Sequence, residues 1–542
     1  MKTSTLRGFL ALHTWVGLAS GLLLFIAFYA GAFTLFHHQL EDWERQPAAT
    51  AHALAATPDT TPADALATAQ RLLDSTLAAH PAAAEDLRLW LPGEHAETPT
   101  LYWYENGTAS GRQTHILTLD AHGALAEQPE LPDFAGLVYR LHYTAGLPAQ
   151  IGIYLFGFVC VLYGVALVSG VVIYMPTFLR DLFALRAGRN IKRYWQDAHN
   201  VVGLLSLPFH VIFAWSGAVL CIGLVMLAPF QFLVFDGKLL QVVQPEIDPT
   251  PVVEPAKTAA PLQPVTALVA SARQQIPGLV VERLYIQHAG DAKAQVTVEG
   301  DTPQGALNAR SAVVLDGVTA APRRVFDPNR QSPGQAFMYG LFALHFGDFG
   351  GAALRWLYSA LGLAGAFLFY SGNLLWVEAR RRHHAPVQRS ACIRMAQLTL
   401  GVSLGCCAGI AAMAWAARLV PLLTGQPAGE ALMPSYLAVF GLMVLWALLR
   451  APSHGARELL WLTAGLHAAV PLLELLDLQR ATPAAADGAT RLAVSGIALL
   501  LATGFALAAR QVQQRAQTGD RHSVWAAPQR VAETASAHRP LP

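Results

Sequence analysis

The sequence predicts an α-helical polytopic membrane protein with eight spans. It is built from a duplicated unit of span, α+β domain and span that forms a four-helix core, and four further spans follow. Three observations predict this fold class. The 542 residues are 54% hydrophobic and only 13% charged, which is too few charges for a soluble protein of this size. Long apolar runs recur along the chain, and one set of His, Gly and Ser positions occurs twice at the same spacing.

Charge and cysteine usage exclude several classes of protein. The net charge of +1 gives no reason to expect a nucleic-acid partner or a polyacidic substrate. None of the five cysteines lies in a CxxC pair, so disulfides, a thiolate zinc site and covalently attached c-type haem are not expected. The Gly-rich stretch at 347–351 follows a histidine rather than a strand, so the chain is not expected to bind NAD(P)H or FAD.

Eight apolar runs are long enough to cross a bilayer. A spanning helix needs about 20 largely apolar residues to cross a hydrocarbon core of about 30 Å. The first run lacks the small-residue cleavage site of a signal peptide and is predicted to be a signal anchor. The candidate spans are 9–36, 148–176, 198–226, 352–377, 396–420, 434–450, 458–477 and 490–509.

Basic residues set the predicted topology. They gather in 179–197, in 380–395 and after 510, and the positive-inside rule places these segments in the cytoplasm together with both termini. In a bacterial inner membrane the long polar segments are then periplasmic. The predicted organisation is 1–39 first span, 40–133 first periplasmic domain, 134–178 second span, 179–197 cytoplasmic loop, 198–237 third span, 238–335 second periplasmic domain, 336–379 fourth span, 380–395 cytoplasmic loop, 396–509 spans five to eight and 510–542 cytoplasmic tail.

The duplication is readable in the spans and in the polar segments. His13 and His199 each have a glycine four residues on, a serine at plus seven and a Gly-Ala pair at plus eighteen. Each polar segment reads as an alanine-rich helix, at 62–80 and at 264–275, followed by alternating strands. Because both copies start on the same side of the membrane, they are predicted to be parallel repeats.

Four histidines occupy equivalent positions in the two repeats. His13 and His199 lie near the cytoplasmic ends of spans one and three, and His142 and His345 lie at the outer mouths of spans two and four. Repeat symmetry can bring His13 opposite His199 and His142 opposite His345. Paired imidazoles in a helical bundle suit the axial ligation of b-type haem, so two haem b groups are expected, one near each membrane face. For a lone histidine a packing role would be preferred.

Three further polar residues are candidate haem contacts, and each also has another interpretation. His210 lies eleven residues after His199 and is a candidate substitute ligand, although the first repeat has Leu24 there, which favours a supporting or packing role. Arg355 and Arg140 are candidate partners of haem propionates, or ordinary interfacial arginines. Glycines near the histidines are expected to leave room for the macrocycle. They are Gly17, Gly21, Gly146, Gly203 and Gly350.

His467 and Glu474 are seven residues apart, on one face of the predicted seventh span. They are candidates for handling protons or a quinol, and a packing pair is preferred.

This pattern resembles the PepSY-associated transmembrane helix family, also described as iron-regulated membrane proteins, and in particular its inner-membrane ferrisiderophore reductases. The matching features are "LHTWVG" and "AHNVVG" at the start of spans one and three, the Leu-His pairs at 142 and 345, and polar domains that resemble PepSY modules. The resemblance covers roughly residues 1–385. It implies a four-helix core with two bis-histidine haems that reduces ferric chelates on the periplasmic side. Spans five to eight lie outside it.

The expected function is therefore that of an oxidoreductase in the bilayer. Electrons would pass from a cytoplasmic flavin reductase, reduced flavin or quinol through the two haems to a ferric siderophore or other ferric chelate, whose reduction releases ferrous iron. Two other functions stay open: a haem-free regulatory or assembly protein whose periplasmic domains bind peptides, and a transporter of a metal or siderophore.

Overall fold

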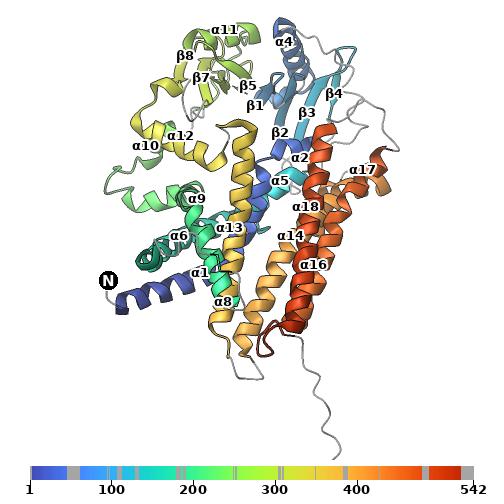
Figure 1. The fold of residues 1–542 in the computed structure, drawn as a ribbon. Helices are drawn as coiled ribbons and strands as arrows, with labels where there is room; N and C mark the ends of the chain where they lie inside the picture. Colours follow the sequence, from blue (N-terminus) through green and yellow to red (C-terminus); the bar gives the residue numbers. More distant parts are fainter. Residues whose placement is uncertain are drawn as a thin grey trace, which may run out of the picture.

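The computed structural model combines a helical bundle with a β-sheet at one end (Figure 1). We call that end the sheet side. The structure describes residues 3–44, 62–93, 96, 98–105, 113–128, 133–178, 185–186, 191–247, 250, 253–302, 307, 310–347, 349–382, 388–425, 428–478 and 488–526.

Helices make up most of the described chain, and seven helical segments within the described residues are long and apolar enough to cross a membrane. These segments begin at Thr3, Ala149, Leu207, Gly351, Ser390, Gly429 and Ala489. The α-helices are α1 (Thr3–Thr34), α2 (His37–Glu44), α4 (Pro62–Ala79), α5 (Phe134–Thr144), α6 (Ala149–Tyr174), α8 (Ile191–Leu205), α9 (Leu207–Leu227), α10 (Leu239–Ile247), α11 (Val265–Gln275), α12 (Pro333–Phe346), α13 (Gly351–Ala379), α14 (Ser390–Thr424), α15 (Gly429–Leu449), α16 (Pro452–Ala468), α17 (Val470–Leu478) and α18 (Gly488–Thr518).

The predicted seventh span, 458–477, is not confirmed as one helix. The chain breaks at Ala469, which separates α16, with 17 residues, from α17, with 9. Pro471 is the second residue of α17, and a proline cannot donate the backbone hydrogen bond that would continue α16. The expectation that His467 and Glu474 share one helix face is therefore wrong.

The predicted third span is also divided. Within 198–226, α8 ends at Leu205 and α9 begins at Leu207, whereas α1, which carries the matching pattern, runs unbroken. Pro208 is in the first turn of α9, where its missing N–H costs nothing. The Ser206 hydroxyl donates to the carbonyl oxygen of Val202 at 2.5 Å, and this carbonyl also accepts from the N–H of Ser206 at 3.1 Å.

Strands from the two polar segments join in one antiparallel eight-stranded sheet. Its order is β4-β3-β2-β1-β5-β6-β7-β8, so each segment contributes four consecutive strands and the halves meet where β1 pairs with β5. The strands are β1 (Asp86–Trp90), β2 (Thr100–Glu105), β3 (Gln113–Leu119), β4 (Leu125–Glu127), β5 (Val280–Gln287), β6 (Gln295–Asp301), β7 (Arg310–Asp316) and β8 (Pro322–Phe326).

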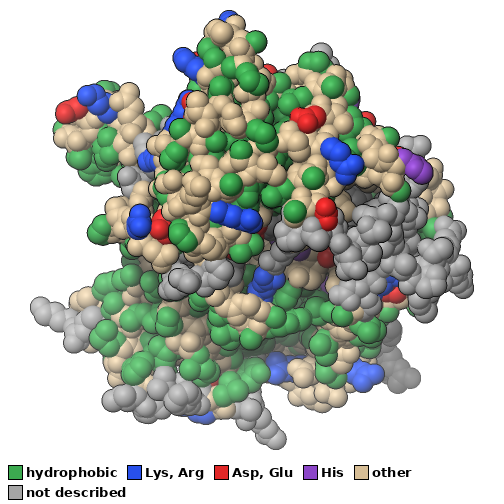
Figure 2. All heavy atoms as spheres, turned by 90° about the horizontal axis from the view of Figure 1, so that it is seen from above, with side chains coloured by type: hydrophobic (Ala, Val, Ile, Leu, Met, Phe, Trp, Pro, Cys, Tyr) green, Lys and Arg blue, Asp and Glu red, His purple; other side chains and the backbone are tan. Residues whose placement is uncertain are grey.

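One face of the sheet is covered by α4 and α11, the two alanine-rich helices that the sequence predicts. Leu87 of β1 pairs with Ile286 of β5, and both are fully buried against Leu72 of α4 and Leu268 of α11. Residues of β1 alternate between buried and half-buried, as expected of a sheet with one covered face. Basic and acidic side chains are interspersed over the visible sheet side (Figure 2).

The C-terminal helices pack against the rest of the bundle through α14. This helix contacts α1, α5 and α13, and α15 and α16 pack on it in turn (Figure 1). Small residues make close contact possible: a Cβ on Gly401 would lie 2.8 Å from the backbone of Val444 in α15. Helices in membranes associate through such small-residue interfaces. The C-terminal helices are therefore part of one continuous core with α1.

Candidate functional site

Two pairs of imidazoles lie inside the bundle, one at each end. The ring centres of His13, in α1, and His199, in α8, are 6.3 Å apart. Those of His142, in α5, and His345, in α12, are 6.1 Å apart. Each member of a pair comes from a different half of the first 379 residues, and these are the pairs that the repeat symmetry suggests.

The first pair is held by backbone carbonyls of neighbouring helices. Nδ1 of His13 donates to the carbonyl oxygen of Ala166 in α6 at 2.9 Å, and Nδ1 of His199 donates to the carbonyl oxygen of Leu368 in α13 at 3.1 Å. A carbonyl only accepts, so Nδ1 carries the proton in both rings. Nε2 is then the unprotonated nitrogen, which is the form that binds a metal.

The second pair is anchored through the same ring nitrogen. Nδ1 of His142 donates to the carbonyl oxygen of Ala27 in α1 at 2.8 Å. Nδ1 of His345 lies 2.6 Å from the Ser216 hydroxyl, which donates its own proton to the carbonyl oxygen of Ile212 at 2.6 Å. The hydroxyl therefore accepts from His345. All four imidazoles thus present Nε2 as the free acceptor.

A glycine lies beside each of the three backbone carbonyls that accept a hydrogen bond from a histidine. In a helix the carbonyl of residue i accepts from the N–H of residue i+4. The residue at i+4 is Gly31 for Ala27, Gly170 for Ala166 and Gly372 for Leu368. A Cβ on Gly31 would lie 2.6 Å from Nδ1 of His142, and Cβ atoms on Gly170 and Gly372 would lie 3.1 and 3.3 Å from Cε1 of His13 and His199. The missing side chains let each imidazole reach a carbonyl that already accepts one hydrogen bond.

The glycines expected to make room for a macrocycle are a different set. A Cβ on Gly17 would meet nothing within 4 Å, whereas one on Gly203 would lie 3.3 Å from Leu368. Gly146 has a φ of 82°, so its role is in the turn that follows α5. The sequence analysis missed the anchoring role of the three glycines above. In the sequence, the feature that could have indicated this role is a glycine four residues after the residue whose carbonyl accepts from a histidine.

The two pairs fit haem iron better than a metal held by protein ligands alone. No group of three or more His, Cys, Asp or Glu side chains among the described residues could hold a metal ion, whereas structural zinc takes four such ligands. Haem iron takes four ligands from the porphyrin, so two imidazoles are enough to complete its coordination. A metal lies about 2 Å from each imidazole nitrogen, so facing nitrogens lie about 4 Å apart, and the ring centres lie somewhat further apart. The separations of 6.1 and 6.3 Å suit this arrangement.

His210 lies between the two pairs, completely buried, with both ring nitrogens engaged. Nε2 lies 2.9 Å from the hydroxyl of Ser206, whose proton is already donated to Val202, so Nε2 is the donor. Nδ1 then accepts from the hydroxyl of Tyr163. In this conformation His210 has no free nitrogen for a metal, which agrees with a supporting role and not with substitution for a ligand.

Aromatic rings surround His210 and reach one of the pairs. The ring of Phe28 lies 5.1 Å from Phe369, 5.7 Å from Phe213 and 5.8 Å from Tyr163. Phe213 in turn lies 5.1 Å from His345. The sequence analysis missed this cluster, because aromatic residues are ordinary in apolar spans and the four rings come from four helices.

The two candidate arginines lie on the sheet side. Arg140, in α5, is exposed and donates to Asp133 at 2.6 Å. Arg355, in the second turn of α13, is half-buried. Their contact with haem propionates stays a prediction.

Comparison with known proteins identifies relatives of this chain. The family model described as "PepSY-associated TM region" matches residues 10–379. An uncharacterized protein of Pseudomonas aeruginosa is 29% identical over 298 residues, which is 51% of this chain and 70% of that protein.

Proposed function

We propose, from the premise that this chain belongs to the PepSY-associated TM family of multi-pass membrane proteins, that it holds two haem b groups and passes electrons across the membrane to a ferric chelate. His13 and His199 would hold one haem, and His142 and His345 the other. Bound there, haem supplies a one-electron iron centre whose axial positions are both filled, which suits electron transfer rather than oxygen chemistry.

The main support for this proposal is the hydrogen bond that each of the four imidazoles donates. Each ring donates Nδ1–H to a fixed acceptor and presents Nε2. Histidines that bind metals donate their second ring nitrogen in this way, which fixes the tautomer and orients the ring. A pair of histidines that served only helix packing would have no need of free nitrogens on both rings.

The two pairs lie at different depths, as transfer across a membrane requires. His13 precedes Ala27, whose carbonyl anchors His142, by fourteen residues of one unbroken helix. At 1.5 Å per residue this separates the two levels by about 21 Å along α1, most of a bilayer core of about 30 Å. The buried aromatic cluster around Phe28 fills part of the space between them and excludes water.

The sheet side is the proposed place of the acceptor. His142 and His345 lie in α5 and α12, near the sheet, and the basic residues at the start of α8 and just after the end of α13, which would meet a cytoplasmic donor, lie at the other end. Reduction of ferric to ferrous iron weakens its binding by hard oxygen ligands, so a siderophore or similar ferric chelate is the proposed substrate. The proposed donors are a flavin reductase, reduced flavin or quinol.

The proposal includes a duplicated fold in a bacterial inner membrane. The mirrored strand order supports duplication, as do the two anchors of His13 and His199, which occupy matching positions before Ser169-Gly170 and Ser371-Gly372. We propose that α16 and α17 together make an eighth crossing, which places both termini in the cytoplasm.

The test is the visible spectrum and chelate reduction of the purified full chain in vesicles. A reducible b-type spectrum and electron transfer to an external ferric chelate are expected. His345→Ala should abolish chelate reduction, while His122→Ala, in an exposed turn beside β4, should leave it unchanged. A colourless protein, or reduction that survives His345→Ala, would overturn the proposal.

A further inference from the structure

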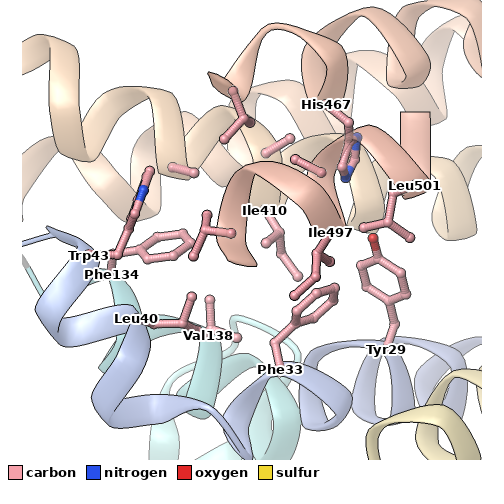
Figure 3. A pocket seen from close by; sticks show the side chains of 15 residues that line it. Tyr29, Phe33, Leu40, Trp43, Phe134, Val138, Ile410, His467, Ile497 and Leu501 are labelled. Atoms are coloured by element: carbon pink, nitrogen blue, oxygen red, sulfur yellow. The ribbon is translucent and has the colours of Figure 1, made fainter. Parts of the chain in front are cut away.

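A cavity lies where the C-terminal helices meet the sheet-side part of the bundle (Figure 3). Its walls come from α1, α2 and α5 on one side and from α14, α16, α17 and α18 on the other. Its interior holds about 90 Å³, or about 620 Å³ when the space at its open mouth is included. None of the four paired histidines lines it, so it is a separate site.

The wall is almost entirely apolar and rich in aromatic rings. Phe33, Trp43 and Phe134 form one part of it, and Ile410, Ile497 and Leu501 form another (Figure 3). Most of these residues come from helices long and apolar enough to span a membrane. A ligand that reaches such a cavity from the bilayer is hydrophobic, and a flat ring in it would pack against the aromatic side chains.

Two hydrogen-bonding groups enter this apolar space. The hydroxyl of Tyr29 lies beside the thiol of Cys407 and makes no hydrogen bond to a nitrogen or oxygen of the described residues, although Tyr29 is only 4% exposed. Nδ1 of His467 donates to the carbonyl oxygen of Thr463 at 2.8 Å, so Nε2 is an acceptor. Figure 3 shows the Tyr29 hydroxyl and the His467 imidazole directed toward each other near Leu501.

The thiol of Cys407 is a weak hydrogen-bond partner, so a ligand oxygen that accepts from the buried Tyr29 hydroxyl would stabilise it further. Together the two groups offer a donor for a carbonyl oxygen and an acceptor for a hydroxyl. A lipid acyl chain could fill the cavity but would give neither group a hydrogen bond.

We propose that this cavity binds the headgroup of an isoprenoid quinone or quinol. The ring would pack among Phe33, Ile497 and Leu501, with one ring oxygen accepting from the Tyr29 hydroxyl and a quinol hydroxyl donating to Nε2 of His467. The proposal concerns binding and does not rest on haem. The cavity lies next to the sheet-side pair, because α5 supplies Phe134 and Val138 to the cavity wall and His142, one turn further on, to that pair. A quinol bound here would therefore reach the sheet-side pair and not the pair that would meet a cytoplasmic donor.

The test is isothermal titration calorimetry of the full chain in detergent with a water-soluble short-chain ubiquinone and with a short-chain naphthoquinone. Saturable binding of at least one quinone is expected. Tyr29→Phe should weaken quinone binding about tenfold, the factor for one hydrogen bond of about 1.4 kcal/mol. His467→Ala should weaken binding of the chemically reduced quinol by the same factor, because only the quinol has a hydroxyl to donate to Nε2. Tyr154→Phe, which removes the same hydroxyl from an exposed position on α6, should leave binding unchanged.

Leu501→Trp is a second variant, which fills the cavity without removing a polar group, and it should abolish binding. Binding that survives Leu501→Trp, an unchanged affinity in both polar variants, or no binding of either quinone would overturn the inference. Haem content measured on the same samples separates the two proposals. Haem without quinone binding contradicts only this inference, and quinone binding without haem contradicts only the proposed function.

Discussion

Nδ1 of His142 donates a hydrogen bond to the carbonyl oxygen of Ala27 at 2.8 Å, across 115 positions of the chain. That carbonyl also accepts from the N–H of Gly31 within α1, and it is accessible because Gly31 carries no side chain. The same arrangement joins His13 to Ala166 beside Gly170 and His199 to Leu368 beside Gly372. The orientation of three imidazoles therefore depends on three glycines.

Gly31→Ala tests this dependence. The new Cβ would lie 2.6 Å from Nδ1 of His142, so the imidazole must move and the sheet-side pair should lose its haem while the other pair keeps its own. Haem content of the purified variant should fall from two per chain to one. Gly8→Ala, in the same helix with nothing within 4 Å of the new Cβ, is the matched control and should keep both. Full haem content in Gly31→Ala would show that the close contact does not orient the ligand.

Ser216→Ala tests the one anchor that is a hydroxyl. It removes the acceptor for Nδ1 of His345, and the loss of such an outer partner weakens metal binding about 10- to 100-fold. Transfer of haem to an excess of a haem-free globin measures this as faster loss of one of the two haems. The control is Ser435→Ala, because the Ser435 hydroxyl donates to a carbonyl of its own helix. Equal rates in both variants would contradict the anchoring role.

His210→Ala separates a structural role from ligation. The change leaves the Tyr163 hydroxyl, in a side chain only 2% exposed, without its partner, which costs about 1–3 kcal/mol of stability. The thermal unfolding midpoint should fall, and haem content should stay at two per chain. Loss of one haem in this variant would instead identify His210 as a ligand.

Glu44 predicts a pH dependence of stability on the sheet side. Burial raises the pKa of this carboxyl from 4.5 to about 8, although it accepts a hydrogen bond from the N–H of Phe134 at 2.7 Å. Below pH 4.5 both folded and unfolded states are protonated, and no stability is lost. Between pH 4.5 and about 8 the unfolded state ionises while the folded state keeps its proton, so the free energy of unfolding decreases as the pH rises.

Glu44→Gln should remove this decrease. The unfolding midpoint of the variant should therefore exceed that of the parent chain above pH 8 and approach it near pH 4.5. Asp42→Asn, at an exposed position of the same helix α2, is the control. An advantage of Glu44→Gln that grows toward low pH would contradict the assigned sign.

Much of the arrangement was predictable because repeated spacing is visible in a sequence. The spacing from His13 and His199 to the later glycines suggested which histidines come together, and the alanine-rich segments predicted α4 and α11. Family membership is confirmed by the match over 10–379. Haem ligation and chelate reduction stay predictions.

Other features depend on contacts that no local pattern contains. The two polar segments form one sheet because β1 pairs with β5 across nearly 200 residues, and alternation within each strand does not identify its partner. The break at Ala469 depends on Pro471 in an otherwise suitable apolar run. Trp43, which looks like an interfacial aromatic, is 2% exposed and donates to Glu474 at 2.5 Å. Its partner lies 431 positions away, outside the family match.

The haem content of the purified full chain decides whether the four paired histidines bind haem. We expect two b-type haems per chain, one in each of His13→Ala and His142→Ala, and none in the double variant. A parent protein that folds in the membrane and carries no haem, or that keeps two in either single variant, would contradict this expectation.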